Sequence, residues 1–163
     1  QFQEEENQVK IFTFSLQYPS IFFPGKTQLS NSPPPKALNI EACLNSINPI
    51  SWLIVAFKIL KYKPDILLVK YWLPFMGPCL GTVSRIVAFF SKTKVITIID
   101  NMIPHEKRIG DKLFTSYYVG GSHAFIAMSE SVLKDIDVFD DALIILSKSF
   151  IGFCVGYPKS SDP

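Results

Sequence analysis

The sequence predicts an α/β domain built on a Rossmann-like, doubly wound and mostly parallel sheet. Short runs of β-branched and aromatic residues alternate along the chain with helix-like segments, which is the pattern of parallel strands joined by crossover helices. The length of 163 residues fits one domain, and a hydrophobic content of 48% is enough for a packed core. We expect right-handed crossovers, helices on both faces of the sheet, and ligands beyond the carboxyl ends of the strands.

Composition excludes several classes of function. The net charge of +2 and the lack of a dense basic patch argue against nucleic-acid binding. The three cysteines, Cys43, Cys79 and Cys154, lack metal-ligand spacing and indicate buried thiols in a reducing compartment. The acidic start "QFQEEENQ" is unlike a signal peptide. Lys58 and Lys148 interrupt the two most apolar runs, so we expect neither to span a membrane, which takes ~20 apolar residues.

The first strand is expected at 9–16, "VKIFTFSL", which is rich in β-branched and aromatic residues. The segment 17–36 is then expected to be a long irregular loop, because Pro19, Pro24 and the prolines at 33–35 prevent regular structure. A loop of this length in a compact domain is usually functional or disordered. It offers at most weak membrane association, because its prolines forbid an amphipathic helix.

Two helices and a strand are expected next. Asn48 caps a helix whose first turn holds Pro49 and whose body runs to Pro64. The apolar run "DILLVKY" (65–71) predicts a buried strand. After the turn "WLPFMGP", a second helix is expected over 79–92.

The last third of the chain continues the alternation. A strand at 94–100 is followed by the polar cluster "DNMIPHEKR", and a helix after it is stopped by Gly120 and Gly121. A strand is expected at 123–128, and Ser129 then caps a helix over 130–137. A fifth strand is expected at 142–147, "ALIILS".

Familiar catalytic motifs are missing. The "FPGKT" stretch has Ser20 where a P-loop needs glycine, and prolines replace the helix that should hold the phosphates. No G-x-G-x-x-G follows a strand, and no second histidine completes a zinc site with His105. His123 lies at the start of a predicted strand and is expected to be structural.

The cluster "DNMIPHEKR" (100–108) has two interpretations. It is a solvated, capped turn, or it is an active-site loop in which Asp100 and His105 orient or deprotonate a hydroxyl at the carboxyl end of a strand. Lys107 and Arg108 would then lie beside an anionic ligand. The spacing alone favours neither interpretation.

Aromatic residues in the preceding strand-to-helix loop raise the same question. Tyr71, Trp72 and Phe75 are either core residues or rings on which sugars and apolar acceptors stack. Ser129 is either a plain helix cap or part of an anion site at a helix N-terminus.

Taken together, several stretches resemble the N-terminal, acceptor-binding domain of a bacterial family 4 glycosyltransferase of the GT-B fold. They are "FSLQYPSIFFPGKTQ", "LNSINPISW", "KPDILLVKYWLPFMGPCLGTVSRI", "KVITIIDNMIPHEKR" and "AFIAMSESVLKDI", in one order over most of residues 8–137. The resemblance implies half of a GT-B fold and transfer of a sugar from a nucleotide-sugar with retained configuration, without a metal or other cofactor. It also implies a cleft that includes the following residues: Tyr71, Trp72, Phe75, Asp100, Asn101, His105, Glu106, Lys107, Arg108, Ser129 and Glu130.

Three departures from that family matter. Its members usually open with a strand, a glycine-rich loop and a helix that this chain lacks, and their donor-binding second domain is absent as well. We therefore expect residues 1–141 to correspond to a partial domain, and 142–163 to a divergent tail that is not a domain of its own. Many members carry a His-Asp pair where this chain has Ile99-Asp100, so the catalytic histidine cannot be carried over.

The sequence thus suggests a fragment of a retaining glycosyltransferase that is inactive alone, acting in the cytoplasm or at the inner face of the membrane. Its partners would be a nucleotide-sugar and a glycan or lipid-linked acceptor. Loss of a central strand would expose sheet edges and favour self-association. The alternative is a non-catalytic Rossmann-like module that binds a sugar or nucleotide, or a subunit that completes an enzyme in trans.

Overall fold

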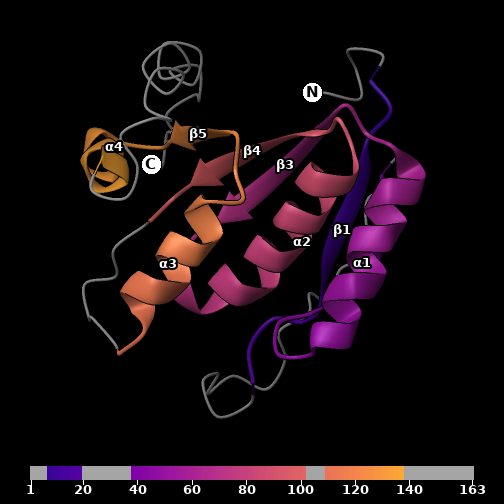
Figure 1. Ribbon diagram of the computed structural model, residues 1–163, viewed down its shortest axis with the longest axis horizontal. Coiled ribbons are helices and arrows are strands. Elements are labelled where there is room, and N and C mark those ends of the chain that lie inside the picture. Colours follow the sequence, from indigo (N-terminus) through magenta and orange to yellow (C-terminus); the bar gives the residue numbers. More distant parts are fainter. Residues whose placement is uncertain (1–6, 20–37, 102–108, 138–163) are drawn as a thin grey trace, which may run out of the picture.

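The computed structural model describes residues 7–19, 38–101 and 109–137, without the side chains of residues 130, 133 and 137 (Figure 1). Strands and helices alternate through these residues, with one short 3-10 helix, η2. In chain order the elements are β1 (Lys10–Leu16), β2 (Asn39–Asn45), α1 (Pro49–Tyr62), β3 (Ile66–Tyr71), η2 (Pro74–Met76), α2 (Gly77–Phe90), β4 (Lys94–Ile99), α3 (Asp111–Val119), β5 (Ala124–Ala127) and α4 (Glu130–Asp137).

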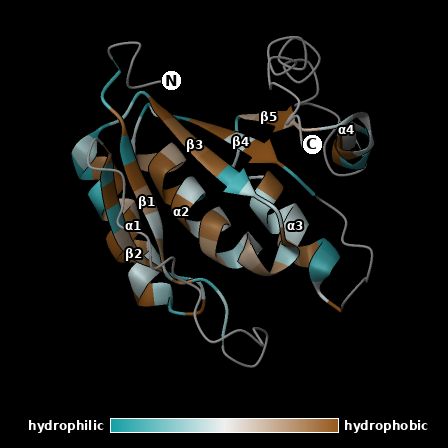
Figure 2. Ribbon diagram, turned by 180° about the vertical axis from the view of Figure 1, so that it is seen from behind, coloured by the Kyte–Doolittle hydropathy of each residue, from teal (hydrophilic) through white to brown (hydrophobic). Residues whose placement is uncertain are grey.

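The strands form two parallel sheets. β1 pairs with β2, and β4 lies between β3 and β5, with Ile66 opposite Lys94 and Ile96 opposite Ala124. In space the ribbons follow the order β2, β1, β3, β4, β5 (Figures 1 and 2). No backbone hydrogen bond joins β1 to β3 among the described residues, so each of these strands is paired on one side only.

A single hydrophobic core nevertheless extends under both sheets. Leu44 of β2 belongs to the same buried cluster as Val69 of β3, and Phe12 of β1 packs against it. Helix α1 supplies Val55 to this core, and the neighbouring helix α2 supplies Val87. The packing of α1 against α2 therefore bridges the gap that the strands leave open.

Local sequence signals explain where α1 begins and ends. The Asn48 side chain accepts a 3.0 Å hydrogen bond from the N–H of Ile50, and Pro49 occupies the first turn, where no donor is needed. The helix ends at Lys63, whose φ of 53° is left-handed, and Pro64 prevents its continuation.

Glycine lets α2 approach α3 closely. A Cβ atom on Gly77 would lie 2.4 Å from the carbonyl oxygen of Phe114, and one on Gly81 would lie 2.9 Å from the ring of Tyr117. Any larger side chain at Gly77 would meet backbone rather than a movable side chain, so this position fixes the spacing of the two helices.

The element order confirms most of the expectations from sequence. The strands expected at 9–16, 65–71, 94–100 and 123–128 are β1, β3, β4 and β5, each within two residues of its expected bounds. All four helices are also present, although α2 begins two residues before the expected start at 79. Strand β2 was not expected, and the strand expected at 142–147 lies outside the described residues.

We expected helices on both faces of the sheet, and the described residues do not show this. Helices α1, α2 and α3 lie on one face of the strands, and no described helix lies in front of β3 and β4 on the other face (Figure 2). Burial along β3 shows the same asymmetry, since Val69 and Tyr71 are buried whereas Ile66 and Leu68 are exposed. A parallel sheet normally has both faces covered. The uncovered face, which we call the open face, exposes the apolar side chains of Ile66 and Leu68 together with Lys70.

Two adjacent substitutions on β3 test this asymmetry. Leu68→Lys adds a charge to the open face, where the native side chain is 43% exposed, so the melting temperature should change little and self-association should weaken. Val69→Lys instead buries an unpaired cation, which costs several kcal/mol and should abolish cooperative melting. Circular dichroism and sedimentation velocity measure the two effects. Equal damage from both substitutions, or a wild-type chain that remains monomeric at high concentration, would contradict the prediction.

Candidate functional site

Every pairing within each sheet is parallel, and the hydrogen bond between Trp72 after β3 and Tyr18 after β1 brings the carboxyl ends of the two sheets to one edge of the fold. The residues that follow these ends are Tyr18 after β1, Trp72 after β3, Asp100 after β4 and Ser129 after β5. In open α/β sheets this edge is where ligands bind. It is therefore the place to look for a site.

Three aromatic residues, which we call the aromatic cluster (Phe14, Tyr18 and Trp72), connect the two sheets at this edge. The Trp72 indole N–H donates a 2.8 Å hydrogen bond to the Tyr18 hydroxyl. The ring of Phe14 meets the indole edge to face, with centroids 6.2 Å apart and an interplanar angle of 87°. All three side chains are half-buried, so the cluster is part core and part surface. Its rings are suited to stacking on the apolar face of a sugar or another flat ligand.

Asp100 lies beside β3 at the same edge. Its backbone N–H donates a 3.1 Å hydrogen bond to the carbonyl oxygen of Tyr71, which continues the ladder between β3 and β4 for one more residue. Its carboxylate Oδ2 lies 2.9 Å from the Nζ atom of Lys70. Both side chains are exposed, so the ion pair adds little to stability, and solvent or a ligand can reach the carboxylate.

The sequence alone did not identify Lys70 or two members of the aromatic cluster, Phe14 and Tyr18, as site residues. Lys70 meets Asp100 only because the register sets it opposite Ile98, and no spacing along the chain reveals that pairing. Phe14 and Tyr18 do carry a signal, since "FSLQYP" spans the end of a predicted strand where ligand-binding residues are expected. That loop was identified, but its tyrosine was not singled out.

Tyr71 ends β3 at this edge, but its side chain lies in the core and not in the cleft that the resemblance implies. Its side chain is fully buried, and its ring stacks on Tyr118 at 4.2 Å with an interplanar angle of 4°. Its hydroxyl is 3.1 Å from that of Thr115, and burial raises the pKa of Tyr71 to about 12. The pKa of Tyr118 is also raised by burial, and its hydroxyl lies 2.7 Å from that of Thr97. This pair of tyrosines holds α3 against β3 and β4.

The other expected site residues lie in different surroundings. Phe75 is half-buried in η2 and packs against the core, and Asn101 is half-buried directly after Asp100. The Ser129 hydroxyl accepts a 3.3 Å hydrogen bond from the N–H of Val132, as an ordinary helix cap does. The backbone of Glu130 begins α4, but its side chain is not described. Four expected residues lie outside the described residues: His105, Glu106, Lys107 and Arg108.

His123 is structural, as its sequence context predicted. Its Nδ1 atom accepts a 3.0 Å hydrogen bond from the N–H of Val95, and its own N–H donates to the Val95 carbonyl oxygen at 2.8 Å. The imidazole thus adds a hydrogen bond to the backbone where the pairing of β4 with β5 begins, at the edge opposite the candidate site.

The described residues show neither a metal-binding group nor a membrane-spanning helix. The described residues contain no group of three or more histidine, cysteine or acidic side chains placed to hold a metal ion. Cys43 and Cys79 are free thiols, and burial raises the pKa of Cys79 to about 12. None of the helices in the described part of the chain combines the length and apolar character that crossing a bilayer requires.

The position of Tyr71 predicts how stability responds to alkali. Its pKa lies above the unfolded value of about 10, so its contribution is complete below pH 10 and is lost as the pH rises toward 12. Between pH 10 and pH 11 the wild type should lose about 1 kcal/mol more of its free energy of unfolding than Tyr71→Phe. Thr115→Val removes the hydrogen-bond partner but keeps the phenol, and should retain the wild-type slope. Urea unfolding at each pH measures these slopes, and identical slopes for the wild type and Tyr71→Phe would contradict the prediction.

The arrangement at the carboxyl edge is thus an aromatic cluster next to an accessible carboxylate and a lysine, on a parallel α/β scaffold. Comparison of the chain with protein-family models, with curated proteins and with solved structures found no match.

Proposed function

We propose that this chain is part of the acceptor-binding half of a retaining glycosyltransferase, which moves a sugar from a nucleotide-sugar to a glycan or lipid-linked acceptor. One observation supports the proposal most strongly: the aromatic cluster and the Lys70–Asp100 pair lie at the same edge of a parallel sheet. The order β2, β1, β3, β4, β5, with unpaired edges between β1 and β3, also agrees with a doubly wound sheet that lacks a central strand. The resemblance of residues 8–137 to such domains supplies the reaction.

The chemistry of the edge suits a sugar acceptor. A pyranose ring presents apolar C–H groups on its faces and hydroxyl groups around its rim. Trp72, held by its hydrogen bond to Tyr18, can receive a ring face, while the Asp100 carboxylate can accept hydrogen bonds from rim hydroxyls. Asp100, together with His105, which follows it in the sequence, would orient the attacking hydroxyl or take up its proton.

Turnover requires the donor as well. Group transfer depends on holding both substrates in a reactive geometry, and in the family that this chain resembles the second domain binds most of the nucleotide-sugar. We therefore propose that this chain binds acceptor but does not catalyse transfer alone.

The second candidate is a non-catalytic sugar- or nucleotide-binding module. The ion pair between Asp100 and Lys70 favours it, because a carboxylate engaged with a cation is a weaker base, and Ile99 stands where many family members have a histidine. A neighbouring reading frame that encodes a donor-binding domain would favour the transferase, and its absence would favour the module.

Acceptor binding can be followed by the tryptophan fluorescence of the chain, to which Trp72 at the site and Trp52 contribute. A panel of bacterial surface oligosaccharides should include one that quenches this fluorescence saturably. Asp100→Asn should weaken its binding about tenfold, since a hydrogen bond to a charged group contributes roughly 1.5–3 kcal/mol. Asp65→Asn, the same change at the opposite edge of the sheet, is the matched control and should bind normally. Saturable binding that Asp100→Asn leaves unchanged would move the site elsewhere.

Transfer itself gives a separate prediction. The purified chain incubated with labelled nucleotide-sugars and the bound oligosaccharide should yield no glycosylated product. Product formed by this chain alone, and lost in Asp100→Asn, would refute the need for a second domain.

A further inference from the structure

Strands β1 and β3 face each other with unpaired edges. The Tyr71 carbonyl oxygen accepts a hydrogen bond from the N–H of Asp100, so Tyr71 and every second residue before it direct their backbone groups to β4. The N–H and C=O groups of Ile66, Leu68 and Lys70 therefore point the other way, toward β1. In the described residues no backbone group pairs with them. We call the space between these edges of β1 and β3 the strand gap.

The two strands that border the strand gap are too far apart to pair directly. Paired strands lie about 4.8 Å apart and contact each other along their length. The described residues show such contact between β1 and β2 and between β3 and β4, but not between β1 and β3. Phe12 and Phe14 on β1 and Leu67 on β3 pack against the core and are only half-buried. The core is therefore incompletely covered along the strands that border the gap.

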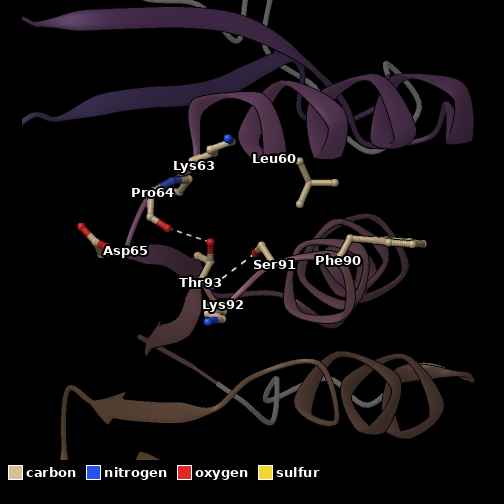
Figure 3. A pocket seen from close by; sticks show the side chains of 8 residues that line it. All are labelled: Leu60, Lys63, Pro64, Asp65, Phe90, Ser91, Lys92 and Thr93. Carbon is tan, nitrogen blue, oxygen red and sulfur yellow. Dashed lines mark hydrogen bonds between the residues drawn. The ribbon is translucent and has the colours of Figure 1, made fainter.

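The helices that bridge the strand gap are incompletely packed at its amino end. A shallow cavity of about 410 Å³ lies between the last turns of α1 and α2, where Leu60 and Phe90 line it next to Asp65, which precedes β3 (Figure 3). At the carboxyl end, by contrast, the hydrogen bond from Trp72 to Tyr18 joins the two sheets. The sheets can therefore move apart more easily at the amino end, which gives an incoming strand a way in.

We propose that the strand gap binds an extended segment of another polypeptide, which adds a strand between β1 and β3. A polypeptide backbone offers N–H and C=O groups along both of its sides, as the two facing edges require, whereas a sugar, a nucleotide or a lipid does not. The folded sheets of a second copy cannot supply such a strand, since every described strand already pairs on at least one side.

The side chains around the strand gap define the sequence of the bound segment. It is apolar at alternate positions, so that one set of its side chains covers Phe12, Phe14 and Leu67. Its length is that of the bordering strands, which have seven residues in β1 and six in β3. The inference rests on the pairing of the strands and does not depend on the proposed function.

A synthetic strand tests the inference with the full chain. The probe is a dye-labelled peptide of seven alternating valines and threonines, as many residues as β1 has, with a lysine at one end and a glutamate at the other. It should bind saturably at concentrations where sedimentation velocity shows a monomeric chain. NMR should show that hydrogen exchange at the N–H groups of Ile66, Leu68 and Lys70 slows about tenfold on binding. The N–H groups of Leu67 and Val69, already bonded to β4, should change less.

Two N-methylated versions of the peptide distinguish insertion from addition to a single edge. One is methylated on the backbone nitrogens of the valines and the other on those of the threonines, so each lacks the donors of one side. Insertion between β1 and β3 uses both sides, so each version should bind about tenfold more weakly than the parent peptide. If either version binds as well as the parent, the peptide pairs on one side only and the proposal is wrong.

Substitutions at Leu68 provide the matched protein variants. Leu68→Pro removes the N–H that points into the strand gap and leaves the hydrogen bonds to β4 in place, so it should weaken peptide binding about tenfold. Leu68→Thr changes the same exposed side chain but keeps the N–H, and should bind within about twofold of the wild type. Circular dichroism checks the folding of both variants. Should Leu68→Pro unfold, the N-methylated peptides and the exchange pattern of the wild type still decide.

Two results would overturn the proposal. One is the absence of saturable peptide binding to the wild type. The other is slow exchange at the N–H groups of Ile66, Leu68 and Lys70 in the chain alone, because the strand gap would then be filled by this chain itself. Slow exchange that depends on chain concentration would assign the gap to a second copy.

Discussion

The packing of α1 against α2 is the interaction on which the arrangement of this domain depends. Backbone hydrogen bonds hold β1 to β2 and β3 to β4 and β5, but none joins the two groups in the described residues. The side chains of the two helices, and the core that they share with Leu44 and Val69, have to align the sheets instead. Hydrophobic contacts are non-directional, so a sheet divided in this way is less rigidly aligned than a continuous ladder of hydrogen bonds.

The geometry of the candidate site depends on the packing of α1 against α2. Phe14 and Tyr18 come from the β1–β2 sheet, whereas Trp72, Lys70 and Asp100 come from the other sheet. The hydrogen bond between the Trp72 indole and the Tyr18 hydroxyl therefore joins the two sheets across the gap between β1 and β3 at the carboxyl edge. A loss of contact between α1 and α2 would separate the two halves of the site before it unfolded either sheet.

Sequence reasoning succeeded where one short segment determines the outcome. The cap at Asn48, the stop at Pro64 and the apolar run of β3 each depend on nearby residues. It missed β2, "NIEACLN", because asparagine and glutamate are poor strand formers. The strand forms because its backbone pairs with β1 and Leu44 enters the core, while Lys10 and Lys58 flank Glu41 and lower its pKa to about 2.

The candidate site was predictable only in part, for the same reason. Asp100 and Trp72 follow strands, so their position at the carboxyl edge could be read from the chain. The period of two along β3 also shows that Tyr71 shares a face with Leu67 and Val69, which favours the core position that it occupies. The partnership of Lys70 with Asp100 and that of Tyr18 with Trp72 need the register and the alignment of two sheets, which no local pattern contains.

Helix α1 links the core to the edge that carries the candidate site. It begins at the carboxyl edge, where the Trp52 indole N–H donates a 2.7 Å hydrogen bond to the carbonyl oxygen of Asn45 at the end of β2. That bond fixes the orientation of the helix relative to the edge that carries the candidate site. The same helix packs against α2 and, through Val55 and Ile59, against the core, so its position also determines where the end of β2 lies relative to Trp72 and Asp100. A substitution that shifts α1 would therefore alter the geometry of the candidate site without changing any of its residues.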